Sequence, residues 1–98
     1  MTSPYAAALR RAFELSLAYL DGVDEAPVAN VVGAPELRAR LDGPLPDTGV
    51  DASAAIEQLA AGVDGGLTAS VGPRFFGWVM GGHLPAALAA DWLTSTWD

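Results

Sequence analysis

The amino-acid sequence predicts a mainly α protein with four helices and one extended, aromatic segment before the last helix. Three observations predict this fold class. Apolar residues recur at spacings of three and four over several stretches. The 11 glycines and 7 prolines gather mostly in the breaks between these stretches. Of the 98 residues, 51% are apolar and 17% are charged, a balance typical of a folded domain and not of a disordered chain.

The first helix is expected over residues 4–21. Ser3 is a good N-terminal cap, and Pro4 suits the first helical position because its missing N–H would have no partner there. Gly22 is a suitable stop signal. The apolar residues of one face are spaced by four, four and three: Leu9, Phe13, Leu17 and Leu20. This stripe packs either into the core of a helical bundle or onto a partner subunit, and the pattern leaves both open.

Residues 22–34 are expected to form an extended linker. Pro27 disfavours a helical conformation at the residue before it. The valines of this stretch suit a strap that lies over another surface. Pro35 then opens a short helix that ends near Leu41.

A third helix is expected over about 52–62. It follows a turn-rich break at 43–49, and either Asp51 or Ser53 is a suitable cap. The apolar residues that share one face of this helix are Ile56, Leu59, Ala60 and Val63. The glycines that end it are Gly62, Gly65 and Gly66.

Residues 67–83 have a different character, since aromatic and β-branched residues there favour an extended segment over a helix. Its aromatic residues are Phe75, Phe76 and Trp78. Core packing is the commonest use of aromatic side chains, and the pattern favours it. The alternative is an apolar wall for a ligand, with Gly77 allowing a close approach to the backbone. Pro85 then opens a fourth helix that runs to Asp98.

Three further features near the C-terminal end have residue types that can carry chemistry. Gly81-Gly82 before a helix is reminiscent of a phosphate loop, but it lacks the usual lysine and spacing, so a flexible turn is favoured. His83 is favoured as a capping or surface residue over a general base, because no nucleophile lies near it in the sequence. Asp91, within an apolar helix, either faces water or pairs with Arg74.

Composition excludes several classes of function. The net charge is −7 and no basic stripe exists, so nucleic acids and anionic membranes are poor partners. There is no cysteine, and the single histidine cannot form a two-histidine metal site within one chain. All five basic residues are arginines, so no lysine can form a Schiff base. No apolar run approaches the length of a membrane span and no signal peptide is evident, so a cytoplasmic protein is expected.

The run from Gly72 to Leu93 resembles a known family signature. It reads GPRFFGWVMGGHLPAALAADWL, and it is similar to the N-terminal signature of the group II pyridoxal-phosphate-dependent decarboxylases. This family includes the aromatic-L-amino-acid, glutamate and histidine decarboxylases. The upstream order agrees with it: an opening helix, then Pro27-Val28, Glu36-Leu37-Arg38 and Pro44-Leu45-Pro46.

The resemblance implies that residues 1–98 are the N-terminal segment of a fold-type I enzyme, with its catalytic domain absent. In this family the segment extends over the partner subunit and forms part of the wall on the substrate side of the active site. The positions implied to line the amino-acid substrate are Phe75, Phe76, Gly77, Trp78, Val79 and Met80. The aromatic-L-amino-acid decarboxylases have the sequence Phe-Phe-Ala-Tyr-Phe-Pro at these six positions. Trp78 therefore keeps an aromatic ring, whereas Val79 and Met80 depart from the family pattern.

The resemblance also implies pyridoxal phosphate as the cofactor of the parent enzyme, held by residues outside this segment. The expected partners are a homodimer subunit or the missing catalytic domain, and the segment is expected to be inactive alone. Two other interpretations remain open. One is a stand-alone helical interaction or dimerisation module, and the other is a small binding protein for an apolar ligand.

Overall fold

The computed structural model describes residues 3–78 and 80–98. The described residues form four helices and no strand, so the mainly α prediction is confirmed. The helices are α1 (Ala6–Gly22), α2 (Ala34–Leu41), α3 (Ala52–Val63) and α4 (Pro85–Trp97). All four lie where the sequence predicts them, within two residues at either end, which is the ordinary spread of helix boundaries.

Helix α1 begins slightly later than Pro4. The hydroxyl of Ser3 accepts a hydrogen bond from the backbone N–H of Tyr5 at 3.2 Å, and the carbonyl of Ser3 accepts one from Ala6 at 3.3 Å. Ser3 therefore stabilises the turn that leads into the helix and not the first helical turn itself. At the other end Gly22 is the last helical residue, as the stop signal indicates.

Helix α3 is capped as predicted, and it packs on α2 through glycine. The Asp51 carboxylate accepts hydrogen bonds from the backbone N–H groups of Ser53 and Ala54, at 3.1 and 3.3 Å. Gly62 is buried, and a Cβ added there would lie only 2.4 Å from Leu41 Cδ2. The absence of a side chain at Gly62 thus lets α2 lie close against α3.

The linker after α1 lies along the segment that follows α3. Gly65 accepts hydrogen bonds from the N–H groups of Val31 and Val32, at 2.8 and 3.0 Å. Val28 accepts one from Ala69 at 2.9 Å. Gly65 has a φ of 77°, a left-handed conformation that a residue with a side chain adopts only with strain. These bonds fix the linker at the end of the helical layer.

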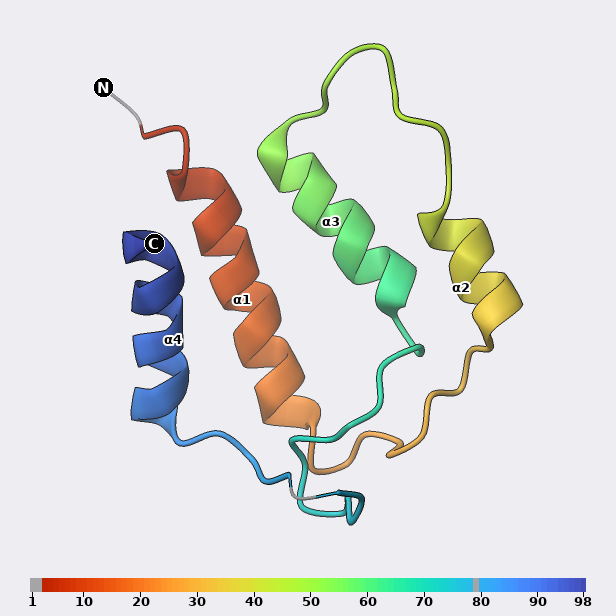
Figure 1. Ribbon diagram of the computed structural model, residues 1–98, viewed down its shortest axis with the longest axis vertical. Coiled ribbons are helices and arrows are strands. Elements are labelled where there is room, and N and C mark those ends of the chain that lie inside the picture. Colours follow the sequence, from red (N-terminus) through yellow and green to blue (C-terminus); the bar gives the residue numbers. More distant parts are fainter. Residues whose placement is uncertain (1–2, 79) are drawn as a thin grey trace.

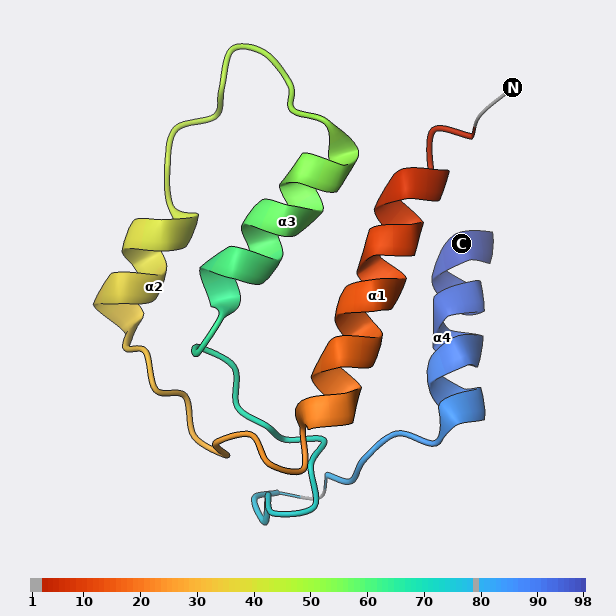
Figure 2. The same ribbon diagram turned by 180° about the vertical axis from the view of Figure 1, so that it is seen from behind.

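The helices lie side by side in the order α2, α3, α1, α4 (Figures 1 and 2). The molecule measures 44 × 36 × 22 Å, so its thin dimension holds little more than one layer of helices. Its radius of gyration is 15.6 Å, against about 12.6 Å for a globular chain of this length. Only Val23 and Ala69 are buried hydrophobic residues in the part of the chain that the structure describes. The layer therefore has almost no core of its own.

The other helices leave most of the apolar stripe on α1 uncovered. Leu9, Phe13 and Leu17 are each about half exposed. Helix α1 contacts α3 through a different face, where Arg11 pairs with Glu57. The bundle-core interpretation is therefore wrong for Leu9, Phe13 and Leu17, whereas Leu20, the last residue of the stripe, is half-buried. Packing onto a partner subunit stays a prediction.

Candidate functional site

The predicted extended segment connects α3 to α4 and carries the candidate site. Its described residues form neither helix nor strand, and turns and bends there alternate with irregular backbone. It is attached near its start, where Gly72 donates a hydrogen bond to Ala69 at 3.1 Å and the Arg74 guanidinium donates one to the carbonyl of Ala26. In Figure 1 this segment lies at the end of the layer where α1 stops and α4 starts. We call its residues 72–83 the strap.

The aromatic side chains of the strap do not form a core. Phe76 is 91% exposed and Trp78 is 87% exposed, whereas Phe75 is half-buried. The Phe75 and Trp78 rings lie 6.0 Å apart with their planes tilted by 40°. Core packing, which the sequence pattern favoured, is therefore wrong for Phe76 and Trp78. The described residues leave both of these rings almost fully open to solvent.

Gly77 and Trp78 give the strap an unusual backbone. A Cβ at Gly77 would lie 2.8 Å from Phe75 Cζ, so the glycine accommodates the Phe75 ring and not an outside ligand. Trp78 has a φ of 49°, in the left-handed region, which costs a residue with a Cβ about 1–2 kcal/mol. Strain of this kind concentrates at functional sites, where the surroundings hold it in place. Here the only aromatic ring beside Trp78 among the described residues is Phe75.

Of the six positions implied to line a substrate, five can be placed. Phe76, Trp78 and Met80 are exposed, while Phe75 and Gly77 are partly covered. Val79 lies outside the described residues. The structure thus brings the rings to one exposed edge, where a second surface would be needed to close a pocket over a substrate.

The other candidates are placed less favourably for chemistry. Arg74 bonds the Ala26 carbonyl, and the ion pairs of the described residues do not include Asp91, so the proposed Arg74–Asp91 pair is wrong. A Cβ at Gly82 would lie 3.0 Å from the carbonyl oxygen of Val71, which explains this glycine by close backbone packing. His83 lines a largely apolar cavity, described next.

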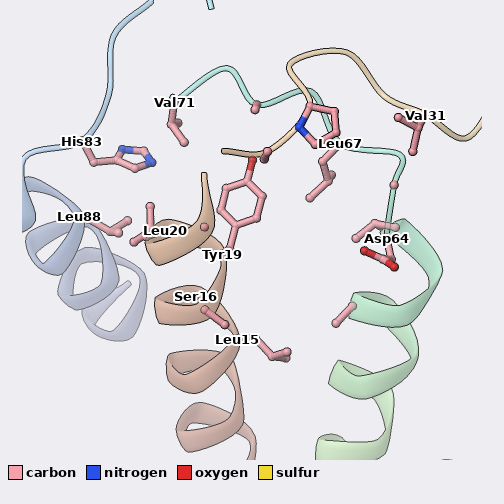
Figure 3. Close-up of a pocket in the computed structure, with 18 of the residues that line it drawn as sticks. Leu15, Ser16, Tyr19, Leu20, Val31, Asp64, Leu67, Val71, His83 and Leu88 are labelled. Atoms are coloured by element: carbon pink, nitrogen blue, oxygen red, sulfur yellow. The ribbon is translucent and has the colours of Figure 1, made fainter. Parts of the chain in front are cut away.

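A wide, open cavity of about 860 Å³ lies between α1, α3 and α4 (Figure 3). Tyr19 stands in its middle, with Leu20, Leu88 and His83 on one side and Leu67 and Asp64 on the other. Sequence reasoning missed this site. A signal was available, because Leu15 and Tyr19 are four residues apart and define a second apolar face of the first helix.

Pyridoxal phosphate does not fit the residues of this chain. The chain has no lysine for a Schiff base, and the cavity lining contains no arginine to hold a phosphate. No step of pyridoxal chemistry can therefore be assigned to these side chains. Among the described residues no three potential metal ligands converge on one point either.

Arg11 and its partners are the strongest electrostatic feature of the helical layer. Its guanidinium bonds Glu57 on α3 and Glu14 on its own helix, the latter at 3.1 Å. The hydrogen bond to Glu57, followed by the one to Glu14, raises the pKa of Arg11 above its ordinary value. The cluster joins α1 to α3 and takes no part in the strap or the cavity.

Comparison with known proteins adds no family assignment. No family model, curated protein or solved structure matches the chain. None of the helices formed by the described residues has both the length and the apolar character needed to cross a lipid bilayer.

Proposed function

We propose that this chain is the N-terminal segment of a pyridoxal-phosphate-dependent amino-acid decarboxylase, inactive alone. In this proposal the helices form part of the dimer interface and the strap forms part of the substrate-pocket wall. The observation that carries it is the strap, which exposes Phe76 and Trp78 almost completely in a layer with almost no core. The sequence from Gly72 to Leu93, with its likeness to the family signature, supplies the choice of enzyme.

Two physical arguments support a role at an interface. Large aromatic side chains are frequent anchors of protein interfaces, where they fill pockets and exclude water. The accessible surface is 7765 Å², which exceeds the value of about 5,300 Å² for a folded monomer of this mass by roughly 2,500 Å². An obligate interface covers roughly 1,000–2,500 Å² on each partner. The surplus is thus of the size that such a partner would cover.

The chain's own contribution to the reaction is to bind and orient the substrate, and not to transfer protons. Phe76 and Trp78 supply an apolar wall that keeps water from the substrate side chain. The cofactor, when bound to the catalytic part of the enzyme, supplies the electron sink for loss of carbon dioxide. The lysine that would hold it belongs to that part, since none is present here.

Reconstitution tests the proposal. The catalytic portion of a bacterial group II decarboxylase, with its own first segment removed, is mixed with this chain and pyridoxal phosphate, and release of carbon dioxide is measured. We expect activity only in the mixture. Phe76→Ala and Trp78→Ala should raise KM, whereas Leu45→Ala, an equally exposed residue in the α2–α3 loop, should not. A borohydride-reducible adduct of the cofactor on the isolated chain would contradict the proposal.

The alternative is a stand-alone interaction module, favoured by the exposed stripe of Leu9, Phe13 and Leu17 on α1. Such a module would pair with a separately encoded protein or with itself and would need no catalytic domain. Size-exclusion chromatography with light scattering separates the two functions. A discrete oligomer that melts cooperatively favours the module, and a monomer that gains structure only with the catalytic portion favours the decarboxylase segment.

A further inference from the structure

We draw no further inference here: the strongest candidate, the open apolar groove around Tyr19 between α1, α3 and α4, carries nothing because nothing in the structure shows what covers it.

Discussion

The half of the molecule that contains α2 and α3 is built differently from the half that contains the strap and α4. In the first half the helices contact each other, a carboxylate caps α3, and Gly62 allows close packing. In the second half α4 has no close helical neighbour, and the strap exposes Phe76 and Trp78. In the first half some apolar residues, such as Leu41, pack within the chain. In the second half Phe76 and Trp78 stay exposed and can pack only against another surface.

The difference teaches which residues specify the fold and which specify association. In the first half the Leu41 side chain packs against Gly62, and the Asp51 carboxylate caps α3, so each of these residues has a partner within the chain. Phe76 and Trp78 in the second half have almost no such contacts, so the free energy of burying them is available to a partner. Substitutions in the two halves should therefore affect different measurements.

The largest effect on stability is expected for Gly65→Ala. Gly65 has a φ of 77°, and a Cβ there would lie 2.8 Å from Val32 Cγ2. The left-handed backbone alone should lower the free energy of unfolding by about 1–2 kcal/mol. Denaturation followed by circular dichroism measures this. Gly81→Ala in the strap is the control, because its Cβ would meet nothing within 4 Å and its φ is not positive. Equal losses for both variants would remove the distinction between the halves.

A smaller loss is expected for Asp51→Ala. The carboxylate caps α3 by accepting hydrogen bonds from Ser53 and Ala54, and loss of such a cap costs about 1 kcal/mol. The same denaturation experiment measures it, with Asp47→Ala in the preceding loop as the control. If Asp47→Ala destabilises the chain as much, overall charge and not the cap would explain the effect.

The Arg11 cluster should contribute less, and its contribution should depend on salt. Arg11→Met removes the bonds to Glu57 and Glu14 that join α1 to α3 and raise the pKa of the guanidinium. These side chains are partly exposed, so salt screens them. The difference in Tm between Arg11→Met and the parent chain should shrink between about 0.1 M and about 1 M sodium chloride. Arg10→Met, which disrupts no ion pair of the described residues, should show no such dependence.

The sequence was sufficient to predict the elements that depend on local chemistry. The helix ends follow from residues such as Pro35, Asp51 and Pro85, whose effect on the backbone is independent of what the chain packs against. Composition likewise predicted that the strap is not helical, but it did not predict the turns and bends at residues 72–74 and 77–78. Local signals of this kind act within a few residues, so one sequence contains them completely.

Burial could not be predicted in the same way. The spacing of Leu9, Phe13 and Leu17 shows that these residues share a face, but it does not say what covers that face. Aromatic composition likewise suggested a core for Phe76 and Trp78, which the structure leaves exposed. The groove around Tyr19 depends on the distance between α1 and α4, which no local signal determines. In this chain the sequence pattern identified apolar faces, and the structure showed that several of them lack an internal partner.

The smallest effect on stability is expected where the side chains are largest. Truncating a buried phenylalanine or tryptophan to alanine costs about 3–5 kcal/mol. Phe76→Ala and Trp78→Ala should each change the free energy of unfolding of the isolated chain by less than about 0.5 kcal/mol, because both rings are almost fully exposed. Trp78→Gly should even stabilise it slightly, since glycine tolerates the left-handed backbone. If either alanine variant unfolds the isolated chain, its ring is part of a core and cannot serve as a surface for a partner. If both alanine variants fold normally and lose activity only in the reconstituted mixture, the free energy of burying these two rings stabilises the association with the catalytic portion.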